Sequence, residues 1–251
     1  MSERPVVISH RTNMGTIAPN SLAGIEAALR DGVDGIEADL RCTRDGVPVL
    51  LHDPVLEPPG AGPRALLDLM DLTMADLRPL RLPDPHAAGA TYAVPTLQEA
   101  LALIAGRTLL VLDVKVPGIG EAAGRTLRAA RVRQPCWIWA FDTAVVEEFR
   151  AVLPSLPRSL LIAPDSPLLD GHAYLDVARD LDCEAVSLEH SLVNAPAVER
   201  ARRRGLRVYA WTVDEADDLA RMDAASVDAV CSDNPAHVLR YWSSRMRGLK
   251  T

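Results

Sequence analysis

The chain has 251 residues, of which 48% are hydrophobic and 24% are charged, and this composition excludes an intrinsically disordered protein. Its formal net charge of −7 excludes general binding to nucleic acid or to an anionic membrane, because both need a basic surface. The length would allow two small domains, but α/β barrels of this length are routinely single domains.

Short apolar, β-rich runs alternate with amphipathic helical stretches along the chain, which indicates a parallel sheet. The predicted strands are Pro5–Ser9, Gly35–Leu40, Thr108–Val114, Cys136–Phe141, Arg158–Ile162, Ala185–Glu189, Arg207–Trp211 and Asp228–Ser232. The predicted helices are Ser21–Arg30, Leu97–Ile104, Gly120–Arg131, Thr143–Val152, Leu168–Leu181, Ala195–Arg204, Glu215–Met222 and Pro235–Arg245.

The helix at Leu97–Ile104 has a clear start, because Thr96 fits an N-cap and Glu99 completes a capping box. Eight strands and eight helices together predict an α/β fold, a (β/α)8 TIM barrel formed by one domain over residues 1–251. An open, doubly wound sheet is the structural alternative.

The apolar run Val47–Leu51 breaks the alternation, because it follows the strand Gly35–Leu40 too closely for a parallel crossover of about a dozen residues. The turn signal Asp45–Gly46 instead predicts a β-hairpin insertion after the second strand, in a segment of about residues 43–94. If the turn is centred between these two residues, His52 lies opposite Asp39. The hairpin therefore returns a histidine to the barrel mouth, where barrel enzymes build their sites.

Polar side chains gather where the first strands and the hairpin end. They are His10 and Arg11 after the first strand, Glu37 and Asp39 on the second, Asp113 and Lys115 on the third, and His52 and Asp53 after the hairpin. Residues two apart on a strand point to the same face, so each strand pair is directed to one side of the sheet. We expect these groups to meet at the mouth.

Three carboxylates without neutralising partners would repel one another and raise their own pKa values. A divalent cation relieves this repulsion, and oxygen-only ligands without cysteine favour Mg²⁺ or Ca²⁺ over zinc. We therefore expect Glu37, Asp39 and Asp113 to bind one divalent cation. The alternative is a salt-bridge network in which Glu37 and Asp39 pair with Arg11 and Arg41.

Histidines and cationic or aromatic groups near these acids are the candidate catalytic and binding residues. His10 alone would be typical of a structural histidine, but His10 and His52 converging on the same acids favour catalysis. Lys115 is either a substrate contact or the solvated end of its strand. Trp211, at the end of a strand, is either core packing or an aromatic wall of the substrate pocket.

The four cysteines are scattered without a CxxC pair, which indicates reduced thiols rather than a zinc site or disulfides. Met1–Pro5 lead directly into an apolar strand without a signal-peptide pattern. No apolar run reaches the roughly 18 residues of a membrane span. We expect a cytoplasmic protein without stable membrane insertion.

An ordered set of short motifs extends through nearly the whole chain. The N-terminal motifs are His10-Arg11, Asn20-Ser21, Gly35–Asp39, Thr43–Gly46 and His52-Asp53. The later motifs are Pro95–Leu97, Asp113–Lys115, Trp211–Val213 and Ser232–Pro235. This order resembles the glycerophosphodiester phosphodiesterase family, which belongs to a TIM-barrel superfamily that also includes the sphingomyelinase D branch.

The resemblance implies metal-dependent hydrolysis of a small-molecule phosphodiester, giving glycerol 3-phosphate and an alcohol. The roles it implies are metal ligation by Glu37, Asp39 and Asp113, acid–base catalysis by His10 and His52, and phosphate contact by Arg11 and Lys115. Nucleic acid is not expected as a partner, and the oligomeric state is left open.

The sequence departs from the family pattern at several positions. Thr12 stands where glycine is usual, and Ala18–Ser21 lacks a usual glutamate. Asp113 replaces a glutamate, although the sphingomyelinase D branch is similar in using Asp-x-Lys there. Pro54–Arg64 replaces a usual arginine-threonine stretch. The alternatives are therefore a cyclising phospholipase of the sphingomyelinase D type and a barrel that binds phosphodiesters or lipid head groups without turnover.

Overall fold

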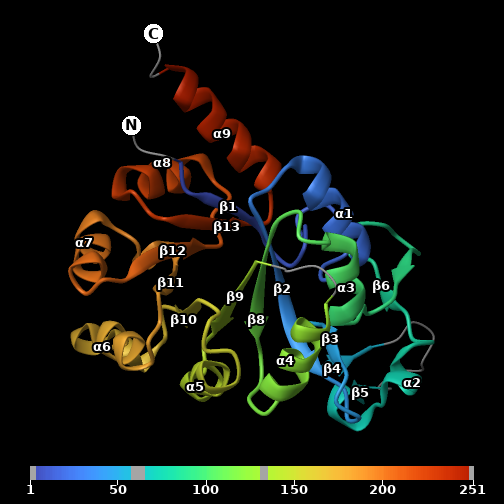
Figure 1. Ribbon diagram of the computed structural model, residues 1–251. Coiled ribbons are helices and arrows are strands. Elements are labelled where there is room, and N and C mark those ends of the chain that lie inside the picture. The colour runs from blue at the N-terminus through green and yellow to red at the C-terminus, as the bar shows by residue number, and fades with distance from the viewer. Residues whose placement is uncertain (1–3, 58–65, 131–134, 249–251) are drawn as a thin grey trace.

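The computed structural model describes residues 4–57, 66–130 and 135–248. Eight parallel strands form a closed barrel with helices around it (Figure 1). The strands are β1 (Val6–Ser9), β2 (Gly35–Cys42), β8 (Leu109–Val114), β9 (Cys136–Ala140), β10 (Arg158–Ile162), β11 (Ala185–Glu189), β12 (Arg207–Trp211) and β13 (Ala229–Ser232). Each strand pairs with its neighbour in chain order, and β1 closes the ring by pairing with both β13 and β2. The predicted TIM barrel is confirmed, and the open sheet is excluded.

Among the described residues, all but one of the eight barrel helices begin within one residue of the predicted position. The barrel helices are α1 (Leu22–Asp31), α3 (Leu97–Ile104), α4 (Gly120–Ala129), α5 (Thr143–Val152), α6 (Ala173–Asp180), α7 (Ala195–Arg203), α8 (Ala216–Ala225) and α9 (Pro235–Gly248), with a 3-10 turn η3 (His190–Leu192) before α7. The predicted capping box of Thr96 and Glu99 is present at the start of α3. The predicted helix end at Arg131 lies outside the described residues.

One predicted helix, Leu168–Leu181, is divided into a 3-10 helix η2 (Pro167–His172) and α6. Asp170 and Gly171 leave helical backbone angles there, and Gly171 takes a positive φ of 59°. The prediction of one continuous helix was therefore wrong for Leu168–His172. Glycine adopts this left-handed conformation without the steric cost that a Cβ adds.

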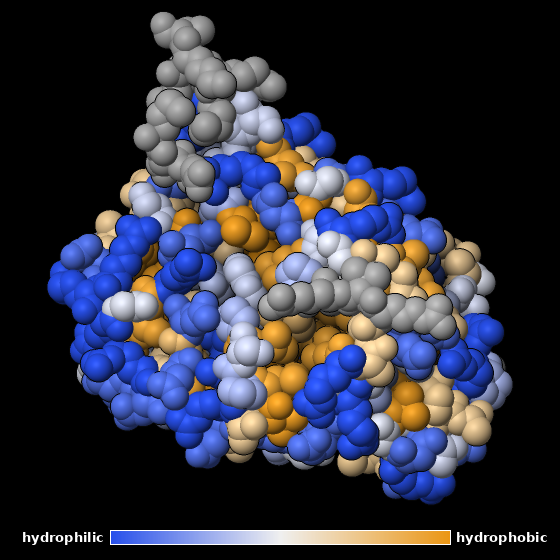
Figure 2. Space-filling model, viewed as in Figure 1, coloured by the Kyte–Doolittle hydropathy of each residue, from blue (hydrophilic) through white to orange (hydrophobic). Residues whose placement is uncertain are grey.

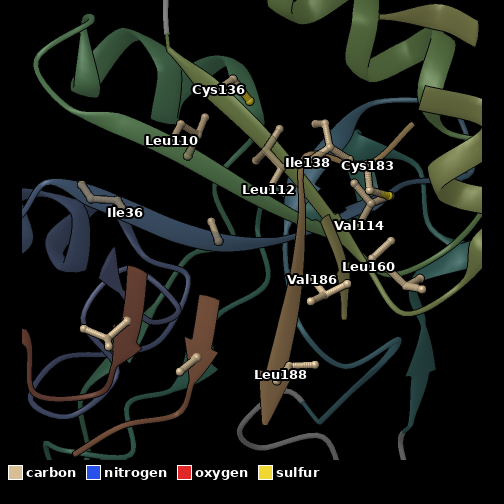
Figure 3. Packing of buried hydrophobic residues seen from close by; sticks show 14 of the residues in the cluster. Ile36, Leu110, Leu112, Val114, Cys136, Ile138, Leu160, Cys183, Val186 and Leu188 are labelled. Atoms are coloured by element: carbon tan, nitrogen blue, oxygen red, sulfur yellow. The ribbon is translucent and has the colours of Figure 1, made fainter. Parts of the chain in front are cut away.

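Side-chain alternation on the strands produces two apolar cores. Residues such as Ile36, Leu112 and Ile138 point outward and pack beneath the helices (Figure 3). The other cluster contains Ile8, Val111, Trp139, Leu161, Ala185, Tyr209, Ala229 and Cys231. Because successive strand residues face opposite ways, Asp113 shares the face of Val111 rather than that of Leu112. The acid therefore belongs to the barrel interior.

The predicted hairpin is present, since β3 (Pro48–Leu50) pairs antiparallel with β2. Its register differs by one residue from the prediction: Leu51, not His52, donates its backbone N–H to the Asp39 carbonyl, at 3.0 Å. The Thr43 N–H bonds the Val47 carbonyl, which leaves a three-residue turn with Gly46 at a φ of 78°. In three-residue hairpin loops of this kind, glycine takes the left-handed conformation. The loop is one residue longer than a two-residue hairpin turn, which accounts for the shifted register.

The rest of the insertion lies beside the β2–β3 edge of the barrel (Figure 1). It comprises β4 (Val55–Leu56), β5 (Leu67–Asp68), the 3-10 helix η1 (Leu69–Asp71), α2 (Met74–Leu77), β6 (Leu82–Pro83) and β7 (Thr91–Tyr92). It has an apolar cluster of its own, which includes Leu56, Leu69 and Leu77. That the chain forms a single domain stays a prediction.

On the face shown in Figure 2, hydrophilic and hydrophobic residues are intermixed. In the described part of the chain, none of the helices has both the length and the apolar character needed to span a membrane. All four cysteines are buried and free, in agreement with the prediction of reduced thiols.

Candidate active site

The three predicted acids meet at the carboxyl ends of β2 and β8. Glu37, Asp39 and Asp113 are all buried, and one oxygen of each lies within 4.8 Å of the others. The strand register explains this, because Asp39 pairs directly with Asp113 across β2 and β8. The structure therefore brings together side chains that are more than 70 residues apart in the sequence.

Asp39 is the acid with the most partners. Its Oδ1 lies 2.8 Å from Lys115 Nζ, and its Oδ2 accepts a hydrogen bond of 2.7 Å from Asn20 Nδ2 and lies 3.4 Å from Arg11 Nε. Burial alone would raise the pKa of Asp39, but Lys115 and Arg11 outweigh it and hold that pKa below its ordinary value. These two cations therefore favour the ionised form of Asp39.

Glu37 and Asp113 are less completely neutralised. Glu37 Oε2 accepts a hydrogen bond of 2.7 Å from the Arg11 backbone N–H, and Asp113 Oδ2 contacts Lys115 Nζ. Their other oxygens, Glu37 Oε1 and Asp113 Oδ1, are buried without a hydrogen-bond partner among the described residues. Burial, reinforced by the charge of Asp39, raises the pKa of Glu37 to about 8, and burial also raises the pKa of Asp113.

These two unpartnered oxygens are the observation that tests the predicted metal site. Buried carboxylate oxygens normally have partners, and oxygens grouped in this way suit a hard divalent cation. The donor set therefore fits Mg²⁺ or Ca²⁺ through Glu37 and Asp113. Asp39 fits as a third ligand that shares its charge with Lys115.

His10 follows β1 and is held by an acid from the other end of the chain. Its Nδ1 lies 2.6 Å from Asp233 Oδ1, while its Nε2 lies 4.0 Å from Glu37 Oε2. Burial would lower the pKa of His10, but the hydrogen bond with Asp233 and the charge of Glu37 outweigh it and raise that pKa. The imidazole is thus oriented with Nδ1 on Asp233 and Nε2 on the side of the acids.

His52 follows the hairpin and lies in a more open environment. Its side chain is 38% exposed, against 18% for that of His10. Its Nδ1 lies 2.8 Å from Asp53 Oδ1, and its backbone carbonyl accepts a hydrogen bond of 2.7 Å from Arg41 Nε. The shifted hairpin register therefore still delivers His52 to the mouth.

A cavity of about 230 Å³ joins these groups. It is lined by His10, Arg11, Glu37, His52, Asp113, Lys115, Trp139, Phe141, Leu161, Trp211, Thr212 and Cys231. Every predicted site residue except Asp39 lines this cavity. Asp39 forms an ion pair with Lys115, which does line it. Trp211 thus belongs to the cavity wall, and its Nε1 donates to the Ser187 carbonyl at 3.1 Å.

Several contributors were absent from the predicted site. Asp233 follows β13 directly, so the strand-end argument that found His10 and Asp113 could also have found it. Asn20 binds both the side chain and the backbone N–H of Asp39. Trp139 and Phe141 line the cavity from β9 and the residue that follows it. In the sequence, Trp139 and Phe141 cannot be told apart from ordinary apolar residues of a buried strand.

Comparison with known proteins agrees with this geometry. The sequence pattern of the glycerophosphoryl diester phosphodiesterase family matches residues 10–237. The chain belongs to this family. That confirms the resemblance seen in the sequence and the predicted enzyme class, a phosphoric diester hydrolase of the glycerophosphodiester phosphodiesterase type.

Individual family members are similar over most of their length. A glycerophosphodiester phosphodiesterase of Caldanaerobacter subterraneus subsp. tengcongensis is 28% identical, over 92% of this chain and 95% of its own. The probable glycerophosphodiester phosphodiesterase 2 of Mycobacterium tuberculosis is 30% identical, over 94% and 89%. A putative family member of known structure, from Silicibacter pomeroyi, has a TM-score of 0.88 and 27% identity, covering 98% of this chain and 95% of its own.

Proposed function

We propose that this chain is a metal-dependent hydrolase that cleaves glycerophosphodiesters into glycerol 3-phosphate and an alcohol, with two histidines as acid and base. The observation that carries the proposal is the convergence of three buried acids, two of them with unpartnered oxygens, and two histidines on one cavity. The names of the similar family members support the substrate class.

Glu37, Asp39 and Asp113 would hold one divalent cation, Mg²⁺ or Ca²⁺. When bound, such an ion supplies positive charge that neutralises the phosphate and stabilises the more highly charged transition state. Arg11 and Lys115 line the same cavity and would bind the remaining phosphate oxygens. A phosphodiester is a monoanion, so these charges suit it.

The two histidines divide the proton transfers between them. One accepts a proton from the water whose oxygen forms the new bond to phosphorus, and the other gives a proton to the alkoxide that leaves when the ester P–O bond breaks. Asp233 binds Nδ1 of His10 and leaves Nε2 for this exchange. Either histidine can be the base, with the other as the acid, because both line the cavity.

The direct test measures glycerol phosphate released from glycerophosphocholine, with Mg²⁺ or Ca²⁺ and with EDTA. We expect activity to require the cation, and each of His10→Ala and His52→Ala to lower kcat by about 10²–10⁴-fold, the usual value of general acid–base catalysis. His86→Ala is the matched control, because this histidine is exposed and does not line the cavity. Normal activity in both site variants, or in EDTA, would overturn the proposal.

The product also separates the reaction types. Phosphorus NMR distinguishes a linear monoester from the cyclic phosphate that a sphingomyelinase D-type lyase would form. We expect the linear product, because hydrolysis adds water directly to phosphorus. Binding of glycerophosphocholine without any product would instead favour a non-catalytic binding barrel.

A further inference from the structure

The walls of the cavity differ in chemistry from one side to the other. The polar side consists of His10, Arg11, Glu37, His52, Asp113 and Lys115, from the ends of β1, β2, β8 and the hairpin. The apolar side consists of Trp139, Phe141, Leu161 and Trp211, from β9, β10 and β12. The two sides occupy different arcs of the barrel, since β1, β2 and β8 are consecutive in the ring. The proposed reaction uses the polar side and leaves the apolar wall unexplained.

The apolar wall is poorly suited to a substituent rich in hydroxyl groups. Trp211 Nε1 already donates to the Ser187 carbonyl. Trp139 is only 2% exposed, and its Nε1 has no hydrogen-bond partner among the described residues. The other polar side-chain group on this part of the wall is the Thr212 hydroxyl. A polyol placed here would lose hydration without equivalent hydrogen bonds, which costs free energy.

Phe141 extends this wall from the cavity to the solvent. It is 46% exposed and packs edge-on against Trp211, with ring centroids 5.5 Å apart and an interplanar angle of 89°. The large hydrophobic residues exposed in the described part of the chain are Leu22, Val55, Leu66, Met70 and Phe141. Of these, Phe141 alone lines the cavity. A ligand chain lying on Phe141 would remove apolar surface from water, which favours binding.

An aromatic wall can also bind a quaternary ammonium group. Here Lys115 Nζ already lies 6.0 Å from the centroid of the Phe141 ring, so a second cation on this ring would be repelled. The apolar wall also contributes no carboxylate to the cavity lining. The wall therefore suits a neutral apolar chain better than a trimethylammonium group.

We propose that the apolar wall binds a single fatty acyl chain, so that the preferred substrates are lysophospholipids rather than fully deacylated glycerophosphodiesters. This rests on the proposed function of the same site. The cavity of about 230 Å³ is small and would hold the phosphodiester, while the chain would extend outward over Phe141.

The test compares glycerophosphocholine with its hexanoyl lysophosphatidylcholine, used as a dissolved monomer, by choline release. We expect the hexanoyl ester to have about a tenfold higher kcat/KM, because partial burial of several methylene groups adds binding. Phe141→Ser should reduce the ratio of the two kcat/KM values toward one. Leu22→Ser is the matched control, since Leu22 is 36% exposed but does not line the cavity, and it should keep the wild-type ratio.

The outcomes separate this inference from the proposed function. Equal kcat/KM values for the two esters, or a ratio unchanged by Phe141→Ser, would overturn the acyl-chain site while leaving the hydrolase intact. If neither ester is cleaved, the proposed function fails, and the two esters then serve as ligands in calorimetry. Tighter binding of the hexanoyl ester, lost in Phe141→Ser, would support the site, and equal dissociation constants would overturn it.

Discussion

His10 and His52 each have a carboxylate on Nδ1, but the two pairs differ in their surroundings. The His10–Asp233 contact is 2.6 Å, and the side chain of Asp233 is 31% exposed. The His52–Asp53 contact is 2.8 Å, and the side chain of Asp53 is 76% exposed. Water screens exposed ion pairs strongly, so Asp53 restricts its histidine much less than Asp233 does. Asp233 is therefore a positioning residue for His10.

We expect Asp233→Asn to lower kcat by about a hundredfold with little change in KM, because the neutral amide no longer supplies the charged acceptor that orients His10 and stabilises its protonated form. Removing the carboxylate also removes a contact that raises the pKa of His10, so the limb of the pH–rate profile that reports this histidine should move to lower pH. Asp53→Asn is the control and should cost less than about tenfold. Equal losses in the two variants, with no shift of the limb, would contradict this role for Asp233.

The loop between β1 and α1 is the element that directs Arg11 toward the acids. Arg11 and Thr12 both adopt positive φ angles, 44° and 75°. For a buried β-branched residue such as Thr12 this conformation is an outlier, and the family pattern usually has glycine there. The Thr12 backbone N–H donates to the Glu37 carbonyl at 2.8 Å, and its Oγ1 accepts from the Ser21 N–H at 3.2 Å. A Cβ on Gly24 would lie 2.2 Å from that Oγ1.

The threonine and the helix glycine therefore form a steric pair, and we expect their substitutions to be coupled. Gly24→Ala alone should lower the free energy of unfolding by about 2 kcal/mol, because a Cβ would be forced into the Thr12 hydroxyl. In a Thr12→Gly background the same substitution should cost little, because the obstructing side chain is gone. Urea denaturation of the four proteins of this cycle gives the coupling. Additive effects would show that the two positions are independent.

At the scale of the whole molecule, the closed barrel confines four ionisable groups, Glu37, Asp39, Asp113 and Lys115, in one buried cluster. Burial would lower the pKa of Lys115, but Asp113 and Asp39 outweigh it and raise that pKa. The Lys115 ammonium therefore pairs with both Asp39 and Asp113. The pKa of Glu37 is raised to about 8. Stability of the cation-free fold should consequently depend on pH.

The sign follows from the Glu37 pKa, which is about 8 in the folded state and near 4.5 ordinarily. The folded state binds the extra proton between these values, so the free energy of unfolding in EDTA should fall as pH rises from about 5 to about 8. Glu37 by itself contributes at most about 1.4 kcal/mol per pH unit to this fall. The raised pKa of His10 acts in the same direction. Asp39, with a lowered pKa, affects stability only in acid.

Denaturant titrations at several pH values measure this slope, and Glu37→Gln is the control that should make it shallower. Added Mg²⁺ should stabilise the wild type more at pH 8 than at pH 6, because cation binding requires deprotonated carboxylates. A slope that is the same in wild type and Glu37→Gln would show that Glu37 does not titrate in this range.

Much of the fold follows from local pattern alone. Three strands, Arg158–Ile162, Ala185–Glu189 and Arg207–Trp211, have the predicted bounds, because repeating apolar spacings fix their type and their ends. In each of the other five strands, one bound moved by one or two residues. In a parallel barrel all strands end at one face, so polar residues at strand ends gather there whatever the packing details. This is why His10, Glu37 and Asp113 could be predicted as one site.

Other features were decided only by the tertiary structure. Asp233 meets His10 because barrel closure pairs β13 with β1 and sets Ser9 beside Ser232, so the residues that follow each are neighbours. The hairpin register depends on the left-handed conformation of Gly46, which moved Leu51 opposite Asp39. The sequence by itself determined the barrel and the kind of chemistry at its mouth, because both follow from local spacing. The pairing of charges within the site required closure of the ring, because its members come from distant strands.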